Sequence, residues 1–297
     1  MVSSSVHTAV MVREALEFLD LKAGCYIIDC TVGAGGHSKK ILEKIIPGGK
    51  LIGLDQDPEI LEIAAKELAE FKEHVILTKE NFRNLDLVLK DLKIDKVDGV
   101  IFDLGVSSLQ LESSLRGFSF NQDGPLDMRM SDTGKSAAEL VNFLGKDELA
   151  DIIYKFGEER YSRRIAEAIA QERRRKPINT TAQLKNIVMS AMPKARSWQK
   201  IHPATRTFQA LRIAVNDELG ALEEALDKGV EALKPGGRIC VISFHSLEDR
   251  IVKNTFRELA KGSMLEIRTK KPVIPQDSEI KNNPRARSAK LRAAIKI

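Results

Sequence analysis

The first hundred residues alternate short apolar runs with segments of helical periodicity. Four runs are short enough to be buried strands, at residues 25–30, 50–55, 74–78 and 97–103. Between the second and third runs, apolar side chains recur at helical spacing, at Ile60, Leu61, Ile63, Ala64, Leu68 and Phe71. Strands that alternate with helices predict right-handed crossovers and a parallel sheet covered on both faces, which is an α/β fold.

This alternation stops in the middle of the chain. From about Ser107 to Thr207 the sequence is rich in helix formers and has few strand-like runs. Helical patterns there cover residues 146–156, 161–174 and 182–192. We therefore expect an all-helical segment inserted into the α/β fold.

Strands return in the last third of the chain. An amphipathic helix ends at Gly236 and Gly237, and the apolar run at residues 238–244 predicts a fifth strand. Further on, apolar and polar residues alternate over residues 265–269 and 291–297. This period of two predicts a pair of antiparallel strands at an edge of the sheet.

The composition is that of a globular protein, with 43% hydrophobic and 30% charged residues among 297. No stretch approaches the roughly 18 uninterrupted apolar residues that a membrane span needs, and the N-terminus lacks the pattern of a signal peptide. The cysteines Cys25, Cys30 and Cys240 are an odd number without metal-ligand spacing, which suits a reducing compartment. We expect a cytoplasmic protein without a membrane partner.

The net charge of +5 is unevenly distributed along the chain. Residues 155–212 contain 14 Lys and Arg but 4 Asp and Glu, a local charge of +10 that leaves −5 for the rest. A basic block on an otherwise acidic protein predicts a polyanionic partner such as nucleic acid. The alternative is a solvated helical surface.

A glycine-rich turn follows the first predicted strand, in the sequence DCTVGAGGHS from Asp29. Gly33 and Gly35 let the chain turn sharply and let a ligand approach the backbone. A dinucleotide-binding turn would have Gly-x-Gly-x-x-Gly, but Ser38 occupies the third glycine position. An acidic residue followed by Gly-x-Gly instead suits a ligand with a cationic amino-acid end. His37 is either a ligand contact or an ordinary residue of a helix N-terminus.

Acidic residues also end the second and fourth predicted strands, at Asp55 and Asp103. Ligands of open parallel sheets bind at the carboxyl ends of the strands, where these residues would join Asp29. Asp55 can accept both ribose hydroxyls of an adenosine, or it can cap the following helix as a turn residue. Three acidic strand ends indicate a cleft for a cationic ligand, and we expect no metal.

Longer segments span nearly the whole chain and together are very specific. They are DCTVGAGGHS from Asp29, DLGVSSLQL from Asp103, RGFSFNQDGPLDMRM from Arg116, GEERYSRRIAEAI from Gly157, HPATRTFQALRIAVN from His202, SFHSLEDRIVK from Ser243 and NPRARSAKLR from Asn283. On these segments the chain resembles the bacterial 16S ribosomal RNA cytosine-N4 methyltransferases, the small-subunit methyltransferase H or MraW family.

The resemblance implies a class I S-adenosylmethionine-dependent methyltransferase fold, which is Rossmann-like. Its sheet is mostly parallel and seven-stranded, with an antiparallel C-terminal strand. Residues 1–106 and 208–297 would form the methyltransferase domain, and residues 107–207 an inserted helical domain for substrate recognition. The resemblance also implies methylation of N4 of cytidine 1402 in 16S ribosomal RNA. The partner would be the small ribosomal subunit rather than DNA, and the chain would be a monomer or a homodimer.

The family motifs also carry over contacts to S-adenosylmethionine. The ring of Phe82, after the third strand, stacks on adenine or packs in the core. Gln110 is a ligand contact or an amide on a helix surface. With Asp29 and Gly33 of the glycine-rich turn added to the contacts that the motifs carry over, the expected cofactor site comprises Asp29, Gly33, Gly35, Gly36, His37, Asp55, Phe82, Asp103 and Gln110.

The group that accepts the proton of the amine is left open by the sequence. DNA amino-methyltransferases have Asp, Asn or Ser followed by Pro-Pro and an aromatic residue after the fourth strand, whereas this chain has Asp-Leu-Gly-Val from Asp103. Asp103 therefore serves either the amine or the cofactor alone. Ser107 and His245 are the other catalytic candidates, and His245 is alternatively a structural residue at a helix start.

Arginines of the insert can bind phosphates, or they can form ion pairs within the insert, for example with Glu158 or Glu159. The run at residues 173–176 predicts a solvated loop that faces RNA, and Trp198 either stacks on a base or packs internally. The expected RNA contacts are Arg116, Arg129, Arg160, Arg164 and Arg206.

Two rival functions fit parts of this pattern. One is an RNA-binding ribosome-assembly factor that holds the nucleoside as a structural ligand, which would leave RNA unmethylated. The other is a NAD-dependent oxidoreductase, which Ser38 and the basic insert disfavour.

Overall fold

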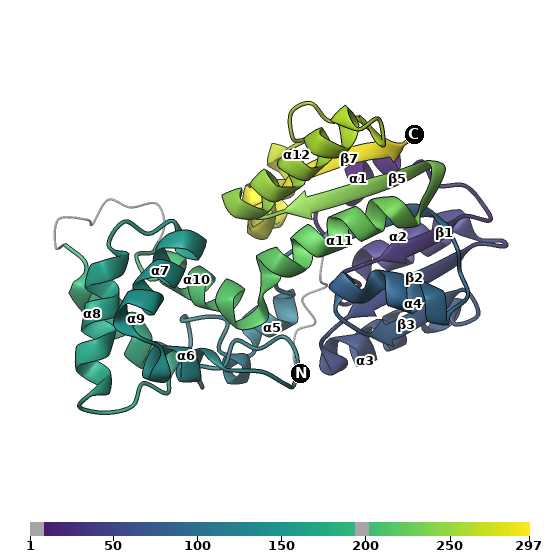
Figure 1. Cartoon of the computed structure of the whole chain (residues 1–297). Coiled ribbons are helices and arrows are strands. Elements are labelled where there is room, and N and C mark those ends of the chain that lie inside the picture. The colour runs from purple at the N-terminus through teal and green to yellow at the C-terminus, as the bar shows by residue number, and fades with distance from the viewer. Residues whose placement is uncertain (1–8, 194–201) are drawn as a thin grey trace. The chain divides into compact units, whose positions relative to one another are not determined.

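A computed structural model describes residues 9–193 and 202–297 of the chain (Figure 1). The chain separates into two compact units. The first, which we call the α/β unit, comprises the chain up to Gly105 together with Leu219–Ile297, and the second, the helical unit, comprises Val106–Glu218. Trp198, a candidate for base stacking, lies outside the described residues.

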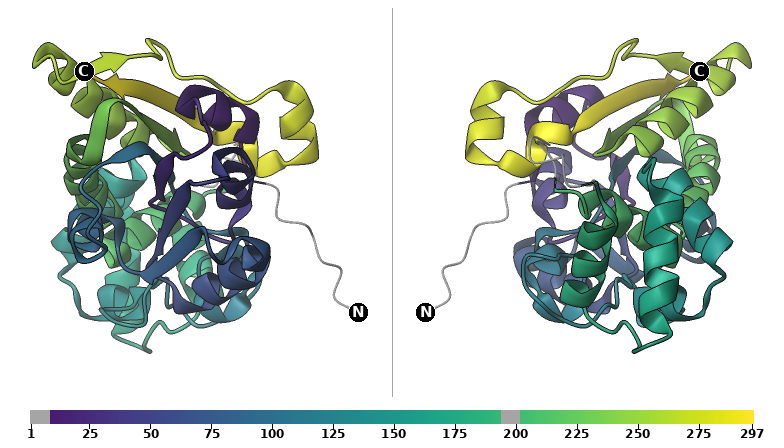
Figure 2. Two further views of the ribbon diagram at one scale, coloured as in Figure 1. Left: turned by 90° about the vertical axis from the view of Figure 1, so that its right-hand side faces the viewer. Right: turned by 90° about the vertical axis from the view of Figure 1, so that its left-hand side faces the viewer.

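Within the described residues, the α/β unit contains one seven-stranded sheet with the order β3-β2-β1-β4-β5-β7-β6. The strands are β1 (Tyr26–Asp29), β2 (Lys50–Asp55), β3 (Val75–Lys79), β4 (Val97–Asp103), β5 (Leu233–Ser243), β6 (Leu265–Ile267) and β7 (Lys290–Lys296). Strands β1 to β5 pair in parallel. Strand β7, yellow in Figure 2, runs antiparallel to β5 and to β6 at the edge. The predicted fold class, with its antiparallel C-terminal pair, is confirmed.

Apolar side chains on alternate strand positions point to opposite faces of this sheet. On one face, Ile28 and Val100 pack in a core with residues of α4, α11 and α12. On the other face, Ile27 and Ile101 pack with residues of α1, α2 and α3. These helices are α1 (Val12–Leu19), α2 (Gly36–Ile45), α3 (Pro58–Glu67), α4 (Leu85–Asp91), α11 (Glu218–Ala232) and α12 (Ser246–Lys261). Burial on both faces explains why the central strands β1, β2 and β4 are continuous apolar runs in the sequence.

The fifth strand is longer than the sequence predicts. It begins at Leu233, so that Gly236 and Gly237 lie inside the strand rather than before it. Its pairing with β4 changes register between Val97 and Gly99, and Gly236 has a φ of +80°. The two glycines therefore form an irregularity in a strand, where we expected them to end a helix.

The helical unit has its own apolar core, formed mainly by α6 to α10 (Figure 1). Its helices are α5 (Ser108–Glu112), α6 (Ala137–Phe143), α7 (Lys146–Gly157), α8 (Ser162–Arg173), α9 (Thr181–Ala191) and α10 (Thr205–Asn216). The three helices that the sequence predicts correspond to α7, α8 and α9. We expected the insert to end at residue 207, but Phe208 and Leu211 of α10 are buried in this core, so the unit extends to Glu218.

Candidate active site

The three acidic strand ends lie at one edge of the sheet, as the sequence predicts. Strand β1 lies between β2 and β4, and Asp29 is in register with Gly53 on one side and Ile101 on the other. Asp55 and Asp103 each lie two residues beyond those partners. Three carboxylates from adjacent strands are thereby brought together within the α/β unit.

Asp29 is almost fully buried and is held by two hydrogen bonds. The hydroxyl of Ser38 donates to its Oδ2 at 2.7 Å, and the backbone N–H of Thr31 donates to its Oδ1 at 3.1 Å. Burial raises the pKa of Asp29 to about 6, and these two hydrogen bonds oppose the rise. Ser38, which breaks the dinucleotide-binding pattern, thus has a structural purpose that the sequence did not reveal.

The glycine-rich turn adopts backbone conformations that favour glycine. Gly33 has a φ of +52° and Gly35, the residue before α2, has a φ of +89°. The N–H of Gly33 donates to Oδ2 of Asp55 at 3.2 Å, which ties the turn to the second acidic strand end. At Gly36, by contrast, packing is the constraint, because a Cβ there would lie 2.9 Å from Cβ of Ala9.

Asp55 does not cap the helix that follows it. Asp57 is the N-cap of α3 and accepts the N–H of Glu59 at 3.1 Å. Oδ1 of Asp55 instead accepts the N–H of Asp57 at 3.0 Å. Burial raises the pKa of Asp55 to about 6, and repulsion from Asp57 and Asp29 adds to the rise against the hydrogen bonds from Asp57 and Gly33. Asp55 therefore stays largely ionised at neutral pH and can accept further hydrogen bonds.

Asp103 lies beside His37 at the start of α2. Its Oδ2 is 3.5 Å from Nδ1 of His37, whose Nε2 is 2.9 Å from the carbonyl oxygen of Val10. Among the described residues, Oδ1 of Asp103 is buried without a hydrogen-bond partner. Burial, together with repulsion from Asp29 and Glu248, raises the pKa of Asp103 well above its usual value. An unsatisfied buried acceptor of this kind is typical of a ligand site.

Phe82, the expected adenine contact, lies in the turn of residues Phe82–Asn84 after β3. Its ring meets that of Phe102 edge to face, with centroids 5.7 Å apart and an interplanar angle of 84°. It packs against the core on the face of α4 while remaining partly exposed. One edge of the Phe82 ring therefore packs against the core, and stacking of the ring on adenine stays a prediction.

Two further candidates form the N-terminal cap of α5, in the helical unit. The hydroxyl of Ser107 accepts the N–H of Gln110 at 3.2 Å, and the side-chain oxygen of Gln110 accepts the N–H of Ser107 at 3.0 Å. The sequence carries the signal for this capping box, a Ser followed three residues later by Gln. Catalysis by Ser107 and cofactor contact by Gln110 stay predictions.

His245 is the N-cap of α12. Its Nδ1 accepts the N–H of Glu248 at 3.4 Å, and Oε2 of Glu248 accepts the N–H groups of Phe244 at 2.8 Å and of His245 at 3.1 Å. Because Nδ1 is occupied by the cap, it is not available as a base. Its Nε2 lies 3.1 Å from Oε1 of Glu248. The cap is the structural alternative that the sequence left open, and a catalytic role for His245 stays a prediction.

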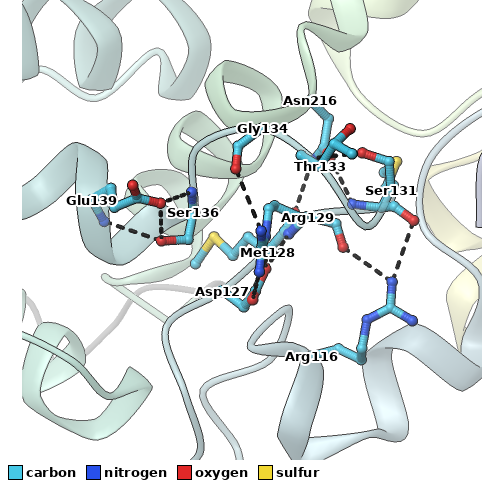
Figure 3. Close-up of polar contacts among 11 residues, drawn as sticks. Arg116, Asp127, Met128, Arg129, Ser131, Thr133, Gly134, Ser136, Glu139 and Asn216 are labelled. Atoms are coloured by element: carbon cyan, nitrogen blue, oxygen red, sulfur yellow. Dashed lines mark hydrogen bonds and ion pairs between the residues drawn. The ribbon is translucent and has the colours of Figure 1, made fainter.

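Two of the five candidate RNA contacts stabilise an irregular segment of the helical unit (Figure 3). Arg129 forms a bidentate pair with Asp127, at 2.8 and 2.7 Å, and Arg116 donates to the carbonyl oxygens of Arg129 at 3.1 Å and Met130 at 3.4 Å. Asn216 holds the same segment by bonding to the backbone of Met128 and Met130, each at 2.8 Å. The guanidinium groups of Arg116 and Arg129 thus stabilise this segment. An RNA contact by either arginine stays a prediction.

The other candidate arginines differ in how far they are engaged. Arg160 lies over the ring of Tyr161 at 4.8 Å, and Arg206 donates to the carbonyl oxygen of Glu158 at 3.1 Å. Arg164 is exposed on α8. Arg173, which we expected in a solvated loop, donates to the carbonyl oxygens of Val141 and Leu144, near the end of α6, at 2.7 Å each. Arg164 is therefore the candidate with the freest guanidinium to offer to a phosphate.

In the part of the chain that the structure describes, no three His, Cys, Asp or Glu side chains are placed so that they could hold one metal ion. Every helix described there is too short or too polar to cross a membrane.

A parallel sheet with an antiparallel seventh strand, together with carboxylates at the ends of β1, β2 and β4, defines the class I methyltransferases. The chain belongs to the MraW methylase family, whose sequence model matches residues 4–297. It is 50% identical to the ribosomal RNA small subunit methyltransferase H of Geobacter sulfurreducens, over 98% of this chain and 99% of that one. The protein of the same name from Geotalea uraniireducens is 49% identical over 98% of each chain. A solved rRNA methylase from Streptococcus thermophilus aligns with 12% identity and a TM-score of 0.43, covering 96% of this chain and 93% of that one.

Proposed function

We propose that this methyltransferase transfers a methyl group from S-adenosylmethionine to ribosomal RNA of the small subunit, at N4 of cytidine 1402 in 16S RNA. The single observation that supports the RNA substrate is the identity of 49 to 50% over nearly full length with proteins named for that activity. The choice of N4 and of cytidine 1402 rests on the family resemblance of the motifs.

The residues at the strand ends fit a cationic nucleoside. Asp29 is buried and Asp55 and Asp103 are half-buried, and like-charge repulsion adds to the raised pKa of Asp55 and Asp103. A ligand with an ammonium and a sulfonium group would relieve that repulsion. Oδ1 of Asp103 has no partner in the described part of the chain, and it offers such a ligand an acceptor.

Each group of the site then has a specific role. Asp55 would accept the ribose hydroxyls, since both of its oxygens keep a lone pair beyond the backbone bonds from Gly33 and Asp57. Gly33 and Gly35 allow close approach to the backbone, and Asp29 contributes negative charge behind the turn. When bound, S-adenosylmethionine supplies an electrophilic methyl group on its sulfonium.

The chain must also orient a poor nucleophile. The lone pair of the cytosine amine is delocalised into the ring, so positioning in line with the methyl group supplies much of the rate, on the order of 7 kcal/mol or more in favourable cases. Asp103, with its free Oδ1, is the residue best suited to accept the amine proton. The helical unit would recognise the RNA through its basic surface.

The test uses 30S subunits from a strain that lacks this methylase. Incubation with the purified chain and tritiated S-adenosylmethionine should label 16S RNA, and mass spectrometry should place one methyl group on the amine of cytidine 1402. Asp103→Asn should reduce the labelling while leaving the melting temperature of the chain near its normal value. Binding of the nucleoside without any labelling would favour the assembly-factor alternative, and label on another nucleotide would refute the assignment to cytidine 1402.

A further inference from the structure

Two aromatic rings and a lysine lie together on the helical unit, far from one another in the sequence. The rings of Phe120 and His202 have centroids 4.7 Å apart and planes inclined by 34°. Nζ of Lys185, on α9, lies 5.7 Å from the centroid of the Phe120 ring and donates to the carbonyl oxygen of Phe120 at 3.5 Å. His202 is exposed, whereas Phe120 is half-buried.

The Phe120 ring also packs against the core of the helical unit. Phe208, which is buried in the core of the helical unit, meets it edge to face at a centroid distance of 4.9 Å and an angle of 70°. The backbone that follows Phe120 is fixed to the start of α9, where Thr181 donates its N–H to the carbonyl oxygen of Gly124 at 2.9 Å. Ala182 donates its N–H to Asp123 at 2.9 Å, so that the charge of Asp123 is used by the helix terminus. The stack therefore rests on a rigid base.

The imidazole of His202 is suited to stacking rather than to pairing with an acid. Its Nδ1 accepts the N–H of Ala204 at 3.2 Å, which places the ring proton on Nε2. Burial and the neighbouring charge of Lys185 lower the pKa of His202. The ring is therefore neutral at physiological pH and keeps an N–H donor.

The charge of the surroundings identifies the kind of partner. Residues 155–212, which include Lys185 and His202, carry a net charge of +10. Exposed aromatic rings beside cations are the usual means by which proteins bind unpaired RNA bases, because bases stack on the rings while phosphates meet the cations. By contrast, the exposed ring of Tyr154 lies on α7 among Asp147, Glu148 and Asp151, which would repel a phosphate.

We propose that Phe120, His202 and Lys185 form a stacking platform for an unpaired base of the RNA substrate. This inference rests on the proposed function for the identity of the RNA, and it adds a site for substrate recognition on the helical unit. A base on the His202 ring would extend the stack, and Lys185 would meet the adjoining phosphate.

The test measures two properties of the full chain in parallel. One is the KM for 30S subunits in methyl transfer, and the other is the Kd for a fluorescein-labelled single-stranded RNA of 20 nucleotides at fixed salt. His202→Ala should raise both the KM and the Kd by roughly tenfold. His202→Tyr, which retains a ring, should have a KM and a Kd close to those of the wild-type chain. Lys185→Gln should weaken RNA binding less and reduce its dependence on salt. The KM for S-adenosylmethionine should not change in any of these variants.

Phe143→Ala is the matched control, because Phe143 is an aromatic residue of the same unit that is 82% exposed and outside the cluster. It should bind the RNA as the normal chain does. The proposal is overturned if His202→Ala binds within twofold of the normal chain, or if Phe143→Ala weakens binding to the same extent. If the normal chain does not methylate 30S subunits, the proposed function fails, and the RNA oligonucleotide still decides whether the platform binds RNA.

Discussion

The imidazole of His37 lies between two acceptors, with Nδ1 3.5 Å from Oδ2 of Asp103 and Nε2 2.9 Å from the carbonyl oxygen of Val10. A neutral imidazole carries one N–H, so it can donate to one of these oxygens. The second proton must come either from an imidazolium or from a protonated Asp103. The two residues are therefore close enough for the protonation of one to affect that of the other.

Replacing His37 with Gln should move the acid limb of the pH–rate profile. In the normal chain the pKa of Asp103 is already raised by burial and by the neighbouring carboxylates. If the ring of His37 is protonated, its removal takes away a favourable charge, so the pKa of Asp103 should rise further. If the ionised carboxylate is the active form, kcat/KM should fall at a higher pH, which a profile from pH 5.5 to 9 would show.

His74→Gln is the control for this experiment. His74 belongs to the α/β unit, and its Nδ1 lies 3.0 Å from the carbonyl oxygen of Gly49, away from the carboxylates. Its profile should match that of the normal chain. Superimposable profiles for His37→Gln and the normal chain would show that the two residues are not coupled.

Binding of S-adenosylhomocysteine should weaken as the pH falls through about 6. Asp29 and Asp55 each have a pKa raised to about 6, so below that pH both become protonated and lose the charge that attracts an ammonium group or accepts ribose hydroxyls. Affinity should be full above about pH 7 and lost toward pH 5. Calorimetric titrations across this range measure the effect.

Asp55→Asn should weaken this binding at pH 7.5 by roughly tenfold or more, since hydrogen bonds to charged groups contribute about 1.5–3 kcal/mol. Its pH dependence should also be shallower, because one of the two titrating carboxylates is gone. Glu70→Gln, at an exposed ion pair with Lys39, should behave as the normal chain does. Equal affinity of Asp55→Asn and the normal chain would remove Asp55 from the cofactor site.

Ser38→Ala should destabilise the chain more at pH 7.5 than at pH 5. The hydroxyl of Ser38 donates to Asp29 at 2.7 Å, and its loss leaves a buried carboxylate oxygen without that donor, at a cost of about 1–3 kcal/mol. A group whose folded pKa is raised stabilises the fold at low pH and loses that contribution as the pH rises. Since the substitution raises the pKa of Asp29 above about 6, the loss should be largest at the higher pH.

Urea denaturation at the two pH values measures the free energy of unfolding for this comparison. Ser38→Thr retains a hydroxyl and is the companion variant, although its extra methyl group enters a buried position. A loss for Ser38→Ala that is the same at both pH values would show that packing, rather than the charge of Asp29, explains the effect.

The sequence predicted β1, β2 and β4 well because each is buried on both faces and so appears as a continuous apolar run. It also located Asp29, Asp55 and Asp103, since parallel topology places successive strand ends at one edge. It did not show that Ser38 bonds to Asp29, because that contact joins a turn to a strand through tertiary structure. Nor did it place α10 in the helical unit, since an amphipathic helix does not reveal which core it faces.

Side chains with two plausible uses were harder to assign. His245 was a candidate because it follows a strand end, and Gln110 because it lies in a family motif. Both side chains form part of the N-terminal caps of helices. For Gln110 the Ser-x-x-Gln spacing was a readable signal. For His245 the signal is weaker, because Glu248 stands at the third position of the helix but histidine is an unusual cap residue.

The arginines of the helical unit should divide into two groups by experiment. Arg164→Gln removes an exposed charge on α8, so it should weaken binding of 30S subunits a few-fold and reduce the slope of log Kd against log salt by about 0.7 to 0.9. Arg129→Gln breaks the bidentate pair with Asp127 and leaves that carboxylate without its partner, so it should lower the melting temperature. If Arg129→Gln instead kept its melting temperature and lost RNA affinity with a smaller salt slope, the guanidinium would have to leave Asp127 to bind phosphate.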